Sequence, residues 1–132
     1  MEDLINFVIN LADEELYEFL DGDSKEFFLH GGCYEFSKII KGCIKDSRVV
    51  INNENTHCGI LFERKIYDAS GKVKNPQDFK VANKDDMAYM EDRFGIPEKH
   101  MVKGKTISDF MIAKIKECNI GKLIERIEGE ER

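Results

Sequence analysis

Three residues of this sequence have types and an order that suit nucleophilic chemistry: Cys33, His57 and Asp68. Cys33 follows Gly31 and Gly32 and begins a run with helical spacing, so we expect its sulfur at a helix N-terminus, where the helix dipole favours a thiolate. His57 opens one strand-like segment and Asp68 ends the next. In a cysteine site of this kind the thiolate attacks, the imidazole carries the proton, and the carboxylate orients the imidazole. The order therefore predicts a catalytic triad that works through a thioester.

Hairpin geometry gives a separate test of the His57 and Asp68 pairing. If Glu63 and Arg64 form a two-residue turn, Asp68 lies opposite Gly59, which faces the same side of the sheet as His57. His57 and Asp68 then become diagonal neighbours on one face. A register shifted by one residue would place them on opposite faces and would remove the site.

The spacing of apolar residues indicates the elements that must position these residues. Helical spacing predicts helices over residues 1–20 (continuous or broken near Asp13), 33–42, 86–94, 107–118, and from 120 to a charged tail at 128–132. Short β-branched runs predict antiparallel strands at 48–52, 58–62 and 65–68. Residues 21–24 are typical of a loop, and strand order cannot be derived beyond Asn75. We expect an α+β fold, residues 1–132 as one domain, with N-terminal helices and a central helix packed on a small antiparallel sheet, and C-terminal helices.

Composition narrows the function classes. The 132 residues are 42% hydrophobic and 35% charged, which is typical of a soluble globular protein. The net charge of −6 argues against a broad nucleic-acid-binding face, because phosphate affinity comes from clustered Lys and Arg. Glu2 and Asp3 stand where a signal peptide would carry basic residues, and no apolar run is long enough to span a bilayer. We therefore expect a cytoplasmic protein without nucleic-acid or membrane partners.

The four cysteines, Cys33, Cys43, Cys58 and Cys118, lack paired C-x-x-C spacing, so we expect free thiols in a reducing cytoplasm. A zinc site built from Cys33, Cys43, Cys58 and His57 is an alternative, although structural zinc sites usually take their ligands in close pairs. The sequence has neither a phosphate-binding glycine loop nor a His-Glu-x-x-His pair. The sequence therefore predicts no cofactor and no metal.

Three segments, 30–36 (HGGCYEF), 56–60 (THCGI) and 65–71 (KIYDASG), resemble the papain-like and transglutaminase-like cysteine proteinase superfamily, and are most similar to its small bacterial and phage members. The resemblance covers about residues 27–71. It implies a cysteine that opens a central helix packed on an antiparallel sheet, with the histidine and an acidic residue on adjacent strands, so that Cys33, His57 and Asp68 form the triad. The chain has no Gln shortly before the cysteine to donate to an oxyanion; Phe27 and Phe28 occupy that region.

The residues that flank the nucleophile are candidates for substrate binding. We expect a peptide or protein substrate to contact Gly32, Tyr34 and His30, with Gly32 letting the substrate approach the sulfur of Cys33 closely. Glu35 is expected to be a solvated helix position.

Each triad residue also has a structural interpretation: Cys33 as a core thiol, His57 as a strand end, and Asp68 as the start of a turn with Gly71. The sequence thus predicts a cysteine hydrolase or acyltransferase of peptidase, isopeptidase or transamidase type. It leaves open whether water or an amine resolves the thioester. A non-enzymatic protein-binding module of phage or mobile-element type with the same fold is the alternative, and a redox-sensing thiol is a third possibility.

Overall fold

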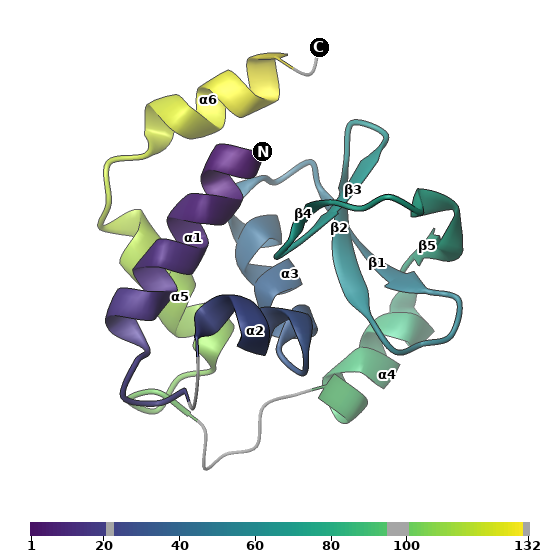
Figure 1. The fold of residues 1–132 in the computed structure, drawn as a ribbon, viewed down its shortest axis with the longest axis horizontal. Helices are drawn as coiled ribbons and strands as arrows, with labels where there is room; N and C mark the ends of the chain where they lie inside the picture. Colours follow the sequence, from purple (N-terminus) through teal and green to yellow (C-terminus); the bar gives the residue numbers. More distant parts are fainter. Residues whose placement is uncertain (21–22, 95–100, 131–132) are drawn as a thin grey trace.

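The computed structural model describes residues 1–20, 23–94 and 101–130 (Figure 1). Within these ranges it contains α1 (Glu2–Glu15), α2 (Ser24–Leu29), α3 (Cys33–Cys43), α4 (Lys84–Phe94), α5 (Ile107–Lys116), α6 (Gly121–Glu130) and a short 3₁₀ helix, η1 (Pro76–Asp78). The strands are β1 (Arg48–Asn52), β2 (Cys58–Phe62), β3 (Lys65–Asp68), β4 (Gly71–Lys72) and β5 (Phe79–Val81). The predicted α+β fold class is confirmed, because three of the described α-helices precede the strands in the sequence and three follow them.

One five-stranded antiparallel sheet has the order β4-β3-β2-β1-β5. Its first four strands form a meander, and β5 pairs with β1 at the far edge. The turn between β2 and β3 consists of Glu63 and Arg64, with φ of 49° and 68°. Two left-handed residues in succession give a turn whose twist matches that of the strands. Phe62 pairs with Lys65, so the register expected from the sequence is confirmed.

Helix α3 is the central helix of the fold. It packs against β2 and also against α2 and α5 (Figure 1), and Phe36, Ile39 and Ile40 are at most 1% exposed. Its apolar residues belong to one core cluster to which the other long helices and the central strands also contribute. Because α3 is covered on several sides, its first turn is buried together with its apolar stripe. This burial fixes the position of the Cys33 backbone.

Glu35 is buried rather than solvated, contrary to expectation. It is 1% exposed, its Oε2 accepts a hydrogen bond of 3.1 Å from the backbone N–H of Ser108, and Lys38 Nζ lies 3.5 Å from the same oxygen. Ser108 lies in the first turn of α5, where backbone N–H groups have no intrahelical acceptor and a negative charge is favourable. Glu35 therefore ties the start of α5 to α3.

Several element boundaries differ from those expected. Helix α1 ends at Glu15 and is followed by turns to Leu20, and α2 occupies a region where no helix was expected. Asp23 caps α2 through a 2.8 Å hydrogen bond from the N–H of Glu26. Helix α4 begins two residues earlier than expected, α5 ends at Lys116, and α6 extends to Glu130. Strands β4 and β5 were not predicted, and residues 131–132 of the expected tail lie outside the described residues.

In the described part of the chain, none of the helices has the length and apolar character required to cross a bilayer.

Candidate active site

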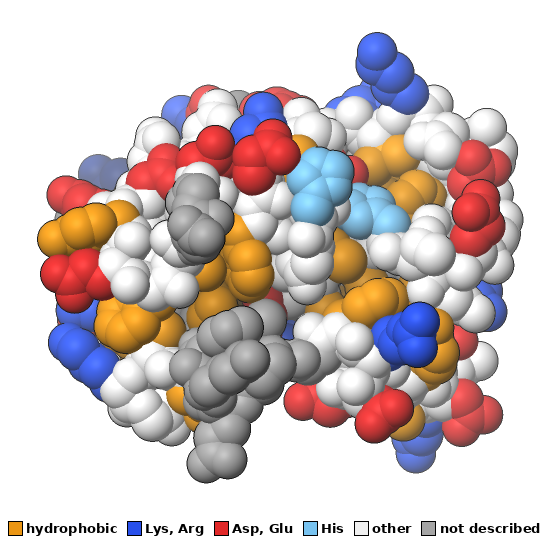
Figure 2. All heavy atoms as spheres, turned by 60° about the horizontal axis from the view of Figure 1, so that its bottom comes forward, with side chains coloured by type: hydrophobic (Ala, Val, Ile, Leu, Met, Phe, Trp, Pro, Cys, Tyr) orange, Lys and Arg blue, Asp and Glu red, His pale blue; other side chains and the backbone are white. Residues whose placement is uncertain are grey.

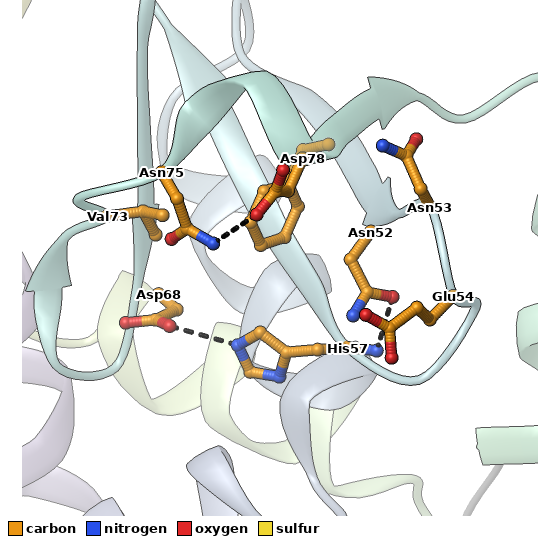
Figure 3. A pocket seen from close by; sticks show the side chains of 9 residues that line it. Asn52, Asn53, Glu54, His57, Asp68, Val73, Asn75 and Asp78 are labelled. Atoms are coloured by element: carbon orange, nitrogen blue, oxygen red, sulfur yellow. Dashed lines mark hydrogen bonds and ion pairs between the residues drawn. The ribbon is translucent and has the colours of Figure 1, made fainter.

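His57 and Asp68 meet on one face of the β2–β3 hairpin. His57 Nε2 lies 2.9 Å from Asp68 Oδ2, as the dashed line in Figure 3 shows. The close approach of the two strands depends on Gly59, because a Cβ there would lie 2.8 Å from the backbone oxygen of Tyr67. Since Nε2 is engaged by Asp68, Nδ1 is the nitrogen of His57 that remains for a second partner.

Asp68 is held in its charged form. Its Oδ1 accepts hydrogen bonds from the backbone N–H of Ser70, at 2.9 Å, and from the Ser70 hydroxyl. Burial raises the pKa of Asp68, but hydrogen bonds from His57 and Ser70 outweigh it, so the pKa lies below its ordinary value. A carboxylate fixed on both oxygens keeps the imidazole of His57 in one orientation.

Asn52, at the end of β1, fixes the backbone that carries His57. Its Oδ1 accepts hydrogen bonds from the N–H groups of Thr56, at 2.7 Å, and His57, at 3.0 Å. The Asn52 N–H in turn donates to the carbonyl of His57 at 2.9 Å. Sequence reasoning did not identify Asn52; an Asn just before a loop between two strand-like runs was the available signal.

The imidazole of His57 is cationic at neutral pH. The hydrogen bond with Asp68 raises the pKa of His57 most, and the hydrogen bond with Cys33 raises it further. Burial lowers this pKa, but the hydrogen bonds outweigh burial, so the pKa of His57 is about 9. The ring of Phe79 packs edge-on against the imidazole, with centroids 6.2 Å apart. His57 is thus a proton donor in the resting site.

Cys33 is the first residue of α3, and Gly32 is its N-cap. Gly31 has φ of 135°, a conformation that other residues rarely adopt, and a Cβ on Gly32 would collide with the ring of Phe27. The two glycines are therefore required for different reasons, one for backbone conformation and one for close packing. Together they set the path by which the chain enters α3, and Cys33 is left 4% exposed.

The sulfur of Cys33 is surrounded by groups that stabilise a thiolate. A hydrogen bond from the Cys58 thiol lowers the pKa of Cys33 most, whereas burial raises it. The hydrogen bond with His57, the backbone N–H of Cys58 and the charge of His57 lower it further. The pKa of Cys33 is lowered to about 5. The arrangement at neutral pH is a thiolate–imidazolium pair, the reactive form of a cysteine nucleophile.

Cys58 has two sulfur neighbours but only one proton to donate. Its Sγ lies 3.1 Å from Sδ of Met90, and it also faces Cys33. A charged thiolate is a stronger acceptor than a neutral thioether, so with Cys33 ionised the proton is drawn to Cys33 and the pKa of Cys58 is raised. Sequence reasoning missed this contact.

The four residues of the alternative zinc site do not all come together. Cys43 lies at the opposite end of α3 from Cys33, and no three His, Cys, Asp or Glu side chains of the described ranges gather as a metal ion would require. Burial raises the pKa of Cys43 to about 11, which makes it an unreactive thiol. Cys43 is therefore a useful internal reference for the reactivity of Cys33.

The three expected substrate contacts lie in different environments. Gly32 is buried beneath Phe27, and Tyr34 is 3% exposed with Lys38 Nζ 4.4 Å from its ring centroid. His30 has a side chain 72% exposed and lies 3.4 Å from Glu26. Figure 2 shows histidine side chains at the surface where the helical part of the molecule meets the sheet. Of the three, only His30 presents its side chain to solvent, and a role in substrate binding stays a prediction for all of them.

A cavity of about 340 Å³ lies beside the His57–Asp68 pair (Figure 3). It is lined by Asn52, Asn53, Glu54, His57, Asp68, Val73, Asn75, Asp78 and Phe79. The His57–Asp68 pair thus adjoins a space large enough for part of a ligand.

In a comparison with known families, the family model described as Phage YunG-like protein matches residues 12–118. The matched region includes Cys33, His57 and Asp68. Neither the curated proteins nor the solved structures gave a match to this chain.

Proposed function

We propose that this chain, which belongs to the Phage YunG-like protein family, is a cysteine-nucleophile hydrolase or acyltransferase of peptidase, isopeptidase or transamidase type. The observation that carries the proposal is the hydrogen bond between the Cys33 sulfur and the His57 imidazole, with Asp68 2.9 Å from the other nitrogen of the same ring. The resemblance of residues 27–71 to papain-like and transglutaminase-like proteinases supports it. Its substrate is a peptide or protein, and its place of action is the cytoplasm.

The reaction follows from the proton positions. The Cys33 thiolate attacks a carbonyl carbon and forms the C–S bond, while Nδ1–H of His57 gives its proton to the leaving amine as the C–N bond breaks. Water or an amine then loses a proton to Nδ1 and attacks the thioester, which frees Cys33. Asp68 holds Nε2–H throughout. Backbone N–H groups of the first turn of α3 have no intrahelical acceptor, and in this mechanism they stabilise the oxyanion.

One observation favours the alternative, a protein-binding module without catalysis that keeps this fold. Cys33 is only 4% exposed, and a substrate carbonyl must reach the sulfur for the reaction to occur. In a binding module the thiol would serve the packing of α3 on β2, and the cavity beside His57 would hold a partner.

Alkylation by iodoacetamide distinguishes the two functions. We expect the rate of Cys33 modification, followed by mass spectrometry between pH 4 and pH 9, to rise with a midpoint near the Cys33 pKa of about 5. Cys43, with its raised pKa of about 11, should remain almost unmodified at pH 6 in the same samples. Modification of Cys33 with the pH dependence of a free thiol, midpoint about 8.5, would contradict the enzyme and favour the binding module.

A further inference from the structure

Resting on the proposed function, we infer that the cavity beside the His57–Asp68 pair binds a basic side chain of the peptide substrate, the ammonium of a lysine or the guanidinium of an arginine. The cavity contains two members of the triad but not the sulfur of Cys33. In Figure 3 the second ring nitrogen of His57 points away from the hollow. The reacting bond therefore lies on the other side of the imidazole, and the cavity receives a neighbouring part of the substrate.

The charge of the cavity is negative. Glu54, Asp68 and Asp78 contribute carboxylates to it, and the His57 imidazolium offsets the charge of Asp68 alone. Among the described residues that line it, none is lysine or arginine. Lys80, the next residue after the cavity wall, instead lies 3.5 Å from Asp86. Glu54 and Asp78 thus leave two negative charges in the cavity wall.

The remaining lining fits an organic cation on an aliphatic stem. The side chains of Asn53 and Asn75 offer amide oxygens to the several N–H donors of an ammonium or guanidinium group. Val73 and Phe79 provide an apolar wall along which methylene groups can pack. A divalent cation would require three or more converging ligands, and the described His, Cys, Asp and Glu side chains do not provide them.

Acidic substrates are disfavoured by the same arrangement. A carboxylate in the cavity would face Glu54 and Asp78 at close range, with no described lysine or arginine in the wall to offset the repulsion. The chain therefore selects substrates that carry a positively charged side chain next to the bond that reacts.

The test uses Nα-acetyl-lysine methylamide as the probe, with Nα-acetyl-norleucine methylamide as the matched ligand that lacks the charge. Binding is followed by NMR on the backbone amides of Asn53, His57 and Asp78. We expect the lysine probe to bind about tenfold more tightly at low salt, the combined effect of two partly exposed ion pairs. The difference should shrink as salt is added.

Two double variants separate a local effect from a general loss of charge. Glu54→Gln with Asp78→Asn should reduce the lysine preference to about threefold or less. Glu14→Gln with Asp92→Asn removes the same charge from exposed positions of α1 and α4 and should leave the preference unchanged. Equal binding of the two probes, or an equal loss in the two double variants, would overturn the inference.

Alkylation of Cys33 in the same samples keeps this inference distinct from the proposed function. Glu54→Gln with Asp78→Asn should not slow the reaction with iodoacetamide, because neither residue contributes to the lowered pKa of Cys33. Fast alkylation without a lysine preference would overturn the cation site and leave the enzyme standing. A lysine preference with slow alkylation would support the cation site and remove the catalytic function.

Discussion

Replacing His57 by alanine is expected to remove most of the Cys33 thiolate at neutral and mildly acidic pH. With the pKa of Cys33 at about 5, the sulfur is almost fully ionised at pH 6. The Cys58 hydrogen bond, which lowers the Cys33 pKa most, remains in the variant, so a return to the value of free cysteine, about 8.5, is the upper limit of the change. A full return would lower the thiolate population roughly 300-fold. The more basic thiolate is intrinsically more reactive by about 40-fold, so the rate of alkylation at pH 6 should fall by up to about tenfold. The measurement is the pH profile of Cys33 modification by mass spectrometry.

A matched variant keeps this prediction specific. His57→Gln retains a hydrogen-bond donor toward Asp68 but cannot carry the imidazolium charge, so it should lower the alkylation rate as alanine does while disturbing the hairpin less. Cys43, whose pKa is raised by burial, provides the internal reference. An unchanged midpoint in both variants would show that Cys58 alone sustains the thiolate, and would remove His57 from the proposed mechanism.

Replacing Glu35 by alanine is expected to cost about 1.3–4 kcal/mol of unfolding free energy. The loss combines a buried N–H of Ser108 without an acceptor, about 1–3 kcal/mol, with the loss of a negative charge at the start of α5, about 0.3–1 kcal/mol. Urea unfolding followed by circular dichroism measures it.

Two comparisons test the mechanism behind that loss. Glu35→Gln keeps an oxygen that can accept from Ser108 and should cost about 1 kcal/mol, because only the charge is removed. Glu14→Ala, at an exposed position of α1, should stay within about 0.5 kcal/mol. A loss below about 1 kcal/mol for Glu35→Ala would show that solvent reaches the N-terminus of α5 and replaces the carboxylate.

The part of the fold that the sequence predicts well is the part governed by local rules. The two-residue turn at Glu63 and Arg64 defines the register of β2 and β3, and the apolar stripe of α3 defines the central helix. Strand β5 is different, because its three residues are ordered by pairing with β1, which is distant in sequence. Helix α2 has six residues, too few for a periodic pattern, and its Asp23 cap was the only clear signal.

Within the site, the same division holds. The relation between His57 and Asp68 follows from strand alternation and turn length, and the structure places the imidazole Nε2 2.9 Å from the carboxylate Oδ2. The burial of Tyr34 and the contact of Cys58 with Cys33 depend on how α3 packs against several elements at once. The periodicity of apolar residues predicts one buried face of a helix. It does not predict which further residues are buried when other elements cover the helix on several sides.

The lowered pKa of Cys33 and the raised pKa of His57 have a joint consequence for proton binding on folding. Between about pH 6.5 and 8.5 an unfolded chain keeps a proton on the cysteine sulfur and none on the imidazole. The folded chain holds that proton on His57, because the pKa values there are about 5 and about 9. Folding therefore transfers one proton from sulfur to nitrogen, and these two groups exchange no net proton with solvent.

Outside that pH range the two groups give the free energy of unfolding opposite dependences on pH. Below about pH 6.5 the unfolded chain binds more protons, so the stability due to the thiolate falls as pH decreases toward about 5. Above about pH 8.5 the folded chain binds more, so the stability due to the imidazolium falls as pH rises through about 9. The measurement compares the unfolding free energy of the native protein with that of a Cys33→Ala, His57→Gln double variant at a series of pH values. The difference between the two proteins should not change with pH near neutrality. A slope in that pH range would contradict the internal proton transfer. The Cys33 sulfur is consequently charged by the act of folding, and an unfolded or nascent chain carries an ordinary thiol there.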